Sequence, residues 1–143
     1  VISVYTVSKD GKVLVTRRSG SKSHPHKWEV TCGSILSGES VEEGAIRELL
    51  EETGIERKAE NLKPIYIHVD DKRHCIYYGF LNLVNSSEMD IKLMPEEIDQ
   101  YRFMELNEFY NFIKSGAFVK SESGRFSIYE DNIKSEIKKI LKK

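Results

Sequence analysis

The stretch GSILSGESVEEGAIRELLEETGI, from Gly33 to Ile55, decides how this chain folds. Ser40 is followed three residues later by Glu43, and this pair forms a capping box of the kind that opens a helix. Gly54 suits the left-handed residue that ends a helix, because glycine has no Cβ to oppose that conformation. The two signals predict a helix from Val41 to Thr53.

This helix carries acids along one edge of its apolar face. A rotation of about 100° per residue places Glu48, Glu51 and Glu52 together beside a broad apolar arc. Like charges at this spacing repel each other, and a bound divalent cation would remove that penalty. Carboxylate oxygens suit Mg²⁺, with Mn²⁺ as the alternative, rather than Zn²⁺. We therefore expect a metal site at this edge of the helix.

Arg47 lies one helical turn from Glu43 and from Glu51, and it can hold a ligand carboxylate in place. A simpler interpretation is that an acid-rich run of this kind is only the solvated face of a helix. The run by itself does not decide between the two interpretations.

Size and composition favour one domain, residues 1–143, with a substantial core. The 22 Lys and Arg residues nearly balance the 23 Asp and Glu residues, which argues against bulk electrostatic binding of nucleic acid. No apolar run reaches transmembrane length, there is no secretion signal, and Cys32 and Cys75 are too few for a disulfide framework. We expect a cytoplasmic protein with no membrane partner and no stable nucleic-acid partner. The start without Met leaves room for residues before Val1, and the sequence is compatible with a homodimer.

Before the acidic helix, the pattern predicts a hairpin and a short strand. Val1–Ser8 is rich in β-branched residues, Asp10-Gly11 is a hairpin turn signal, and Lys12–Arg18 continues as a second strand. Trp28–Thr31 then reads as a short strand that leads into Gly33.

After the acidic helix, further strands are predicted. Cys75–Val84 is apolar on both faces and reads as a central strand, and Gln100–Met104 reads as a later one. Lys63–Val69 alternates in polarity, which predicts that three side chains face inward: Ile65, Ile67 and Val69.

Two late helices complete the expected fold. Asn107 is expected to cap a short helix that ends at Gly116. Ser127 and Glu130 form a second capping box, which predicts the start of a C-terminal helix. That helix has an apolar stripe suited to covering a sheet: Ile133, Ile137, Ile140 and Leu141. The elements together indicate an α/β domain with a mixed sheet between helices.

The loop from Ser19 to Lys27 and the strand end before it carry cations that can meet a phosphate. Arg18 and Lys22 come just before the acidic stretch, so we expect them to face a metal ion bound there. A diphosphate held between a metal ion and such cations has its charge balanced from both sides. Solvated surface charge is the better interpretation of the loop's other basic residues, His24, His26 and Lys27.

The acidic stretch as a whole resembles the box of the Nudix hydrolase family at every defined position. That box reads Gly, five residues, Glu, seven residues, Arg-Glu, an aliphatic residue, any residue, Glu-Glu, any residue, Gly and an aliphatic residue. It is filled here by Gly33, Glu39, Arg47, Glu48, Leu49, Glu51, Glu52, Gly54 and Ile55. Because so many positions agree at fixed spacing, the chain is identified as a member of that family.

The resemblance implies the Nudix fold, a mixed β-sheet in an α/β/α sandwich. It also implies Mg²⁺-dependent hydrolysis of a nucleoside diphosphate derivative, or a related diphosphate, by attack of water on phosphorus. Arg47 would orient the metal ligands. The ligands implied are Glu48, Glu51, Glu52, the main-chain carbonyl of Cys32 and, through water, Glu39.

The general base is expected to be Glu97, with Glu96 second and Glu48 as the alternative within the helix. In this family the base comes either from the box helix or from a later loop. The residues expected to bind the substrate are Arg18, Lys22 and Gly33.

A second resemblance, to isopentenyl-diphosphate isomerases, rests on TRRSGSK, Trp28 and CGSILSGES. Those enzymes share the fold and place a catalytic cysteine at the position of Cys32 and a catalytic glutamate at that of Glu97. They also carry a metal-binding histidine where this chain has Ser34, and they lose most of the helix carboxylates that this chain keeps. We therefore interpret the chain as a hydrolase of the isomerase-like branch. An isomerase and a non-catalytic nucleotide-binding Nudix domain are the alternatives.

Overall fold

The computed structural model describes residues 1–142. Its strands are β1 (Ile2–Ser8), β2 (Lys12–Arg18), β3 (Trp28–Glu29), β4 (Thr31–Gly33), β5 (Leu62–Asp70), β6 (Cys75–Val84) and β7 (Ile98–Glu105). Its helices are α1 (Val41–Thr53), α2 (Leu106–Phe112) and α3 (Lys120–Leu141), with a short 3₁₀ turn, η1 (Ala59–Asn61), before β5.

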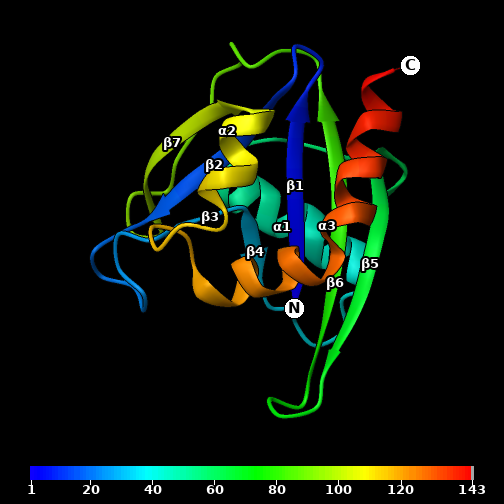
Figure 1. Cartoon of the computed structure of the whole chain (residues 1–143). Helices are drawn as coiled ribbons and strands as arrows, with labels where there is room; N and C mark the ends of the chain where they lie inside the picture. Colours follow the sequence, from blue (N-terminus) through cyan, green and yellow to red (C-terminus); the bar gives the residue numbers. More distant parts are fainter. Residues whose placement is uncertain (143) are drawn as a thin grey trace.

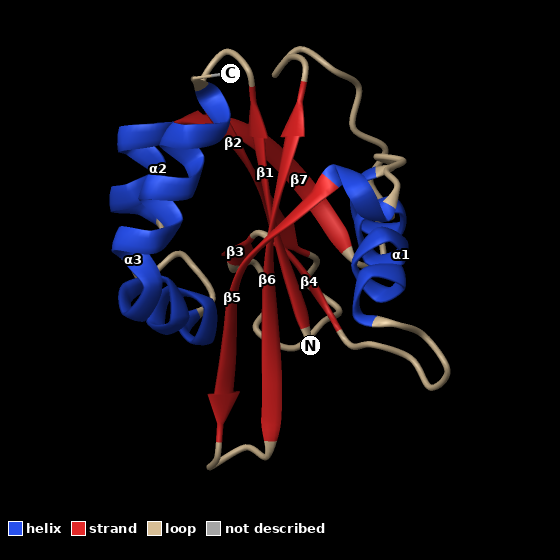
Figure 2. Ribbon diagram, turned by 90° about the vertical axis from the view of Figure 1, so that its right-hand side faces the viewer, coloured by secondary structure: helices blue, strands red, loops and turns tan. Residues whose placement is uncertain are grey.

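The strands form one mixed sheet that lies between helices (Figure 1). Five strands follow the order β3-β2-β1-β6-β5, while β4 pairs with β1 and β7 pairs with β2. Figure 2 shows α1 on one face of the sheet and α2 and α3 on the other. This arrangement confirms the predicted α/β/α sandwich.

The opening hairpin separates soon after its turn. β1 and β2 pair at Val7 and Val13, next to the turn, and then β1 runs parallel to β6 while β2 runs antiparallel to β7. The opening between them receives β3, which pairs with β2, and β4, which pairs with β1. The short strand predicted at Trp28–Thr31 is therefore two short strands, one on each side of Val30. This crossing brings Glu29 beside the end of β2 and Gly33 beside the start of β1.

A hydrophobic core fills each side of the sheet, and β1 contributes to both because all seven of its residues are buried. Tyr5 and Val7 pack toward α2 and α3, whereas Ile2 and Val4 pack toward α1. The predicted apolar stripe of the C-terminal helix is confirmed at its centre, where Ile133 and Ile137 are fully buried.

Helix α1 has the predicted limits and caps. The Ser40 hydroxyl accepts a hydrogen bond from the Glu43 amide at 3.1 Å, and the Glu43 carboxylate accepts one from the Ser40 amide at 2.8 Å. Gly54 has a φ of 77° and its amide donates to the Leu50 carbonyl. Local sequence therefore determines both ends of this helix.

The expected inward alternation of β5 was wrong beyond Ile65. The pairing of β5 with β6 shifts register between Pro64 and Tyr66, so that two successive side chains, Ile65 and Tyr66, are both buried. Beyond this irregularity the alternation is reversed, and Ile67 and Val69 are 63% and 58% exposed.

Both predicted caps of the late helices were wrong. Helix α2 starts directly after β7, so Asn107 lies inside it, and it ends at Phe112 rather than at Gly116. Helix α3 starts at Lys120. Just before it, the Trp28 amide donates to the Ala117 carbonyl and the Val119 amide donates to the Trp28 carbonyl, so the backbone is held in an extended form up to Val119.

The sequence box at Ser127 and Glu130 therefore lies inside α3. There the Ser127 hydroxyl donates to the Ser123 carbonyl, one turn back. The predicted start falls beside a kink, since Tyr129 has φ −107° and ψ 16°.

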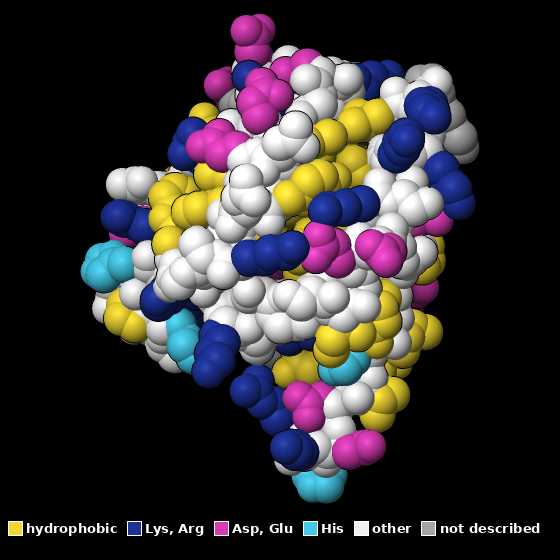
Figure 3. All heavy atoms as spheres, viewed as in Figure 1, with side chains coloured by type: hydrophobic (Ala, Val, Ile, Leu, Met, Phe, Trp, Pro, Cys, Tyr) yellow, Lys and Arg dark blue, Asp and Glu magenta, His cyan; other side chains and the backbone are white. Residues whose placement is uncertain are grey.

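The face covered by α2 and α3 carries mixed charge (Figure 3). Lys114 and Lys134 both form ion pairs with Glu130, and Lys139 pairs with Glu136. Within residues 1–142, no helix has both the length and the apolar character needed to cross a membrane.

Candidate active site

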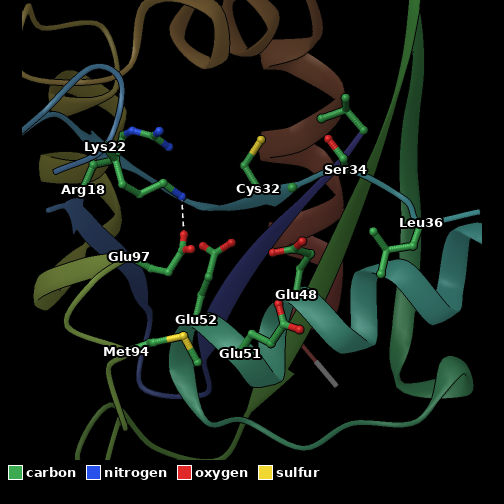
Figure 4. Close-up of a pocket in the computed structure, with 12 residues that line it drawn as sticks. Arg18, Lys22, Cys32, Ser34, Leu36, Glu48, Glu51, Glu52, Met94 and Glu97 are labelled. Atoms are coloured by element: carbon green, nitrogen blue, oxygen red, sulfur yellow. Dashed lines mark hydrogen bonds and ion pairs between the residues drawn. The ribbon is translucent and has the colours of Figure 1, made fainter.

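The acids of α1 and the cations of the preceding loop face each other across one pocket of about 430 Å³ (Figure 4). Glu48, Glu51 and Glu52 point into it from α1, and Arg18 and Lys22 approach from the opposite side. Glu97 also lines the pocket. The structure therefore brings together the residues that the sequence predicted on the two sides of a diphosphate.

Gly33 is placed so that the Glu48 carboxyl group can lie against its backbone. A Cβ on Gly33 would lie 2.2 Å from Glu48 Cδ and 2.5 and 2.6 Å from its two oxygens, which is far inside contact distance. Glycine at position 33 therefore leaves the space that the Glu48 carboxyl group occupies. This role is additional to any contact that Gly33 makes with a substrate.

Arg47 links the carboxylates that flank the pocket. Its Nη1 donates to Glu48 at 3.0 Å and to Glu51 at 3.2 Å, and its Nε donates to Glu39 at 2.7 Å. Glu39 also accepts from the Leu36 amide, and it does not line the pocket. Arg47 thus reaches Glu51 as predicted, while Glu43 is engaged in the helix cap instead.

Among the acids that line the pocket, Glu52 is the least exposed, at 4%, and its Oε1 atom is buried without a hydrogen-bond partner. Burial, together with the neighbouring Glu29 and Glu48 carboxyls, raises the pKa of Glu52 well above its usual value. A buried, unpartnered carboxylate oxygen that faces a polar pocket is a suitable cation ligand. Among the residues described, however, no three acidic, His or Cys side chains already converge on one point.

The loop cations are held by acids. Lys22 Nζ forms an ion pair with Glu97, shown by the dashed line in Figure 4. The loop also bonds to the segment before β7, because the Ser19 amide donates to the Glu97 carbonyl at 3.0 Å and the Ser19 hydroxyl to the Glu96 carbonyl at 2.6 Å. Glu96 takes part through this carbonyl, and its side chain does not line the pocket.

Cys32 and Ser34 lie on either side of Gly33 and both line the pocket. Burial raises the pKa of the Cys32 thiol well above its usual value, and the Glu122 carboxyl adds to this. The thiol group is therefore kept protonated, and the Ser3 hydroxyl lies 3.8 Å from its sulfur.

A group of buried charges was not predicted from the sequence. Glu29 is 2% exposed and holds Arg18, while Glu122 is 2% exposed with both carboxyl oxygens unpartnered. Arg125 lies over the Tyr77 ring at 3.9 Å. Glu29 had one available signal, which is a charged residue inside the otherwise apolar segment Trp28–Thr31. Glu122 and Arg125 gave no such signal, because their local sequence pattern is also that of a solvated helix face.

A family model for the NUDIX domain matches residues 1–123, which is most of the chain. The chain belongs to the NUDIX family. The prediction made from the acidic stretch is thereby confirmed, and the family's shared fold agrees with the sandwich described above.

Among solved structures, the NUDIX chain resembles the DR0079 protein of Deinococcus radiodurans, with a TM-score of 0.72 and 20% identity. The match covers 90% of this chain and 80% of that one. At this identity the likeness supports the fold alone.

Two curated relatives are closer in sequence. An ADP-ribose pyrophosphatase of Methanocaldococcus jannaschii is 32% identical over 105 residues, which are 71% of this chain and 59% of that protein. An isopentenyl-diphosphate Delta-isomerase of Salmonella arizonae is 43% identical over 68 residues, 46% of this chain and 36% of the isomerase. The chain thus spans only part of the length of both relatives.

Proposed function

We propose that this chain is a divalent-metal-dependent hydrolase that cleaves a diphosphate linkage by attack of water on phosphorus. The observation that carries the proposal is the shared pocket, with three helix glutamates on one side and two cations on the other. The relative named as an ADP-ribose pyrophosphatase supports a nucleoside diphosphate derivative as the substrate class.

The donor set fits Mg²⁺ or Mn²⁺. Glu48, Glu51 and Glu52 supply carboxylate oxygens, and the buried Oε1 of Glu52 has no partner until a cation binds. The Cys32 carbonyl would add a ligand, and Glu39 would act through water while it holds Arg47. A bound cation would neutralise phosphate charge and lower the pKa of a bound water.

The protein's own residues perform the remaining steps. Arg18 and Lys22 would bind phosphate oxygens and balance their charge from the side opposite the acids. Glu97 is the proposed base, because its side chain lines the pocket and that of Glu96 does not. Glu48 remains the alternative base within the helix. For Glu97 to act, Lys22 must move from Glu97 to the substrate.

The test is a panel of nucleoside diphosphate derivatives, with ADP-ribose first, assayed with Mg²⁺, with Mn²⁺ and with chelator. We expect metal-dependent release of a monophosphate that Glu52→Gln abolishes. Glu42→Gln is the matched control, because Glu42 is an exposed acid on the same helix outside the pocket. Turnover by Glu52→Gln at the wild-type rate would refute the proposal, and saturable binding without any product would favour a sensor.

Isopentenyl-diphosphate isomerisation is the second candidate, because Cys32 and Glu97 line the same pocket and an isomerase is among the relatives. Ser34, rather than a histidine, lies beside Cys32, and the helix acids are retained. Isopentenyl diphosphate incubated in D₂O separates the two activities. Deuterium incorporation that Cys32→Ala removes would support the isomerase, and its absence in the wild type would exclude it.

A further inference from the structure

The Arg18 guanidinium is held at fixed points on one side of the pocket. Its Nη1 donates to both carboxylate oxygens of Glu29, at 3.1 and 3.0 Å. Its Nε donates to the Ser23 carbonyl at 2.7 Å, and its Nη2 donates to the Ser23 hydroxyl at 3.1 Å. The partners come from β3 and from the loop after β2, so two separate segments fix one side chain.

These bonds leave little of the guanidinium free. A guanidinium has five N–H donors on three nitrogens, and the contacts to Glu29 and Ser23 engage all three nitrogens. Only the N–H groups that these contacts leave over are available to a ligand in the pocket that Arg18 lines. The side chain is also only 15% exposed, which further limits its movement.

The acids on the far side of the pocket would attract the Arg18 guanidinium if it were not held in place. Glu48, Glu52 and Glu97 line the same pocket, and a flexible guanidinium would be attracted to them. An Arg18 that moved there would neutralise the acids and leave the phosphate side without its planar donor. Glu29 offers a bidentate alternative and is itself 2% exposed, so its own position is fixed by packing.

We propose that Glu29 is a positioning residue, which holds the Arg18 guanidinium away from the acids and presents its remaining N–H groups to a substrate phosphate. The inference rests on the proposed function of this pocket. Glu29 does not line the pocket, so it reaches a bound phosphate through Arg18, and its charge also acts on the neighbouring Glu52 carboxyl.

Two variants separate anchoring from charge. Glu29→Gln and Glu29→Met remove the same negative charge, but the glutamine keeps a carbonyl acceptor for Arg18 and the methionine does not. Charge alone predicts that both variants behave identically. Anchoring predicts that Glu29→Met is the more severe, and that the difference disappears when Arg18 is also replaced by methionine.

The probe is inorganic pyrophosphate, titrated by NMR in chelator so that metal binding does not contribute. We expect Glu29→Met to weaken binding on the order of tenfold, as the loss of a charged hydrogen bond would, and Glu29→Gln to weaken it less. The Arg18 Nη1–H signal should be protected in the wild type and lost in Glu29→Met, while the Nε–H, which donates to Ser23, serves as the internal reference. Asp99→Asn is the control, because Asp99 holds Arg17 by two similar bonds, at 2.8 and 3.0 Å, outside the pocket.

Equal affinities in Glu29→Gln and Glu29→Met, or binding as tight as in the wild type, would overturn the proposal. So would a difference that persists in the Arg18→Met background. If Glu29→Met does not fold, the protection of the Arg18 Nη1–H in Glu29→Gln decides, because the glutamine offers one acceptor oxygen in place of two, and full protection would contradict anchoring. The proposed hydrolysis is tested separately, because an active wild type with unaffected Glu29 variants would refute only the positioning role.

Discussion

Gly33→Ala is the sharpest test of the geometry on the acidic side of the pocket. The new Cβ would lie 2.2 Å from Glu48 Cδ, where ordinary contact begins near 3.4 Å, so the carboxyl group must retreat by about 1.2 Å. That carboxyl group also accepts from Arg47 at 3.0 Å, so the shift disturbs the link to Glu51. A displacement of about 1 Å at a catalytic group can lower the rate on the order of 10²-fold.

The assay for Gly33→Ala compares kcat on the substrate found by the panel with the free energy of unfolding in urea. We expect kcat to fall on the order of 10²-fold, while stability changes little, because the atoms that must move are the end of a flexible side chain. Gly124→Ala is the matched control, because a Cβ there has nothing within 4 Å and Gly124 lies inside α3. It should keep wild-type kinetics and gain about 0.5–1 kcal/mol. A folded Gly33→Ala enzyme with kcat within twofold of wild type would show that the Glu48 position does not matter.

Three further substitutions test the packing and the buried charge. Burial raises the pKa of Glu122 well above the unfolded value of 4.5, so the folded state binds the extra proton and the contribution of Glu122 to stability falls as pH rises above about 4.5. Glu122→Gln should be more stable than wild type at pH 7, and it should reduce the pH dependence of the free energy of unfolding by up to about 1.4 kcal/mol per pH unit. Urea unfolding from pH 4 to pH 8 measures this slope, and an unchanged slope would contradict the raised pKa. Leu49→Ala, at a fully buried residue of α1, should cost about 2–5 kcal/mol by urea unfolding, against less than about 1 for the exposed Leu50→Ala. Gly79→Ala would place a Cβ 2.3 Å from the Tyr66 ring and should cost about 1–3 kcal/mol, part of which Tyr66→Leu should restore; no recovery would mean that the clash is elsewhere.

The features that sequence predicted well are those that local chemistry determines. Helix α1 has its predicted limits because Ser40, Glu43 and Gly54 satisfy its terminal backbone groups within a few residues. The acids of that helix share a pocket because helical spacing alone places them on one edge. The strands of the opening hairpin and the central strand β6 followed equally from runs of apolar and β-branched residues.

The features that sequence missed depend on distant partners. The start of α3 is set by backbone bonds between Trp28 and residues 117 and 119, so the local box at Ser127 had no influence on it. In β5 the side chains that face inward change after Ile65, because the register against β6 shifts there, and the alternation of residues along one strand cannot predict that shift. Such contacts join residues far apart in the chain, and only the folded arrangement reveals them.

The separation of β1 from β2 explains why both sides of the pocket could be predicted from sequence while the connection between them could not. Each side is local, with Arg18 at the end of β2 and the acids on α1. The segment from Trp28 to Gly33 crosses the opening between the strands and belongs to both sides, because Glu29 holds Arg18 and Gly33 makes room for Glu48. A six-residue crossing thus sets how the cation side and the acid side are placed relative to each other. It follows that changes in this segment should alter phosphate binding and metal binding together, whereas changes on α1 alone should act on the metal first.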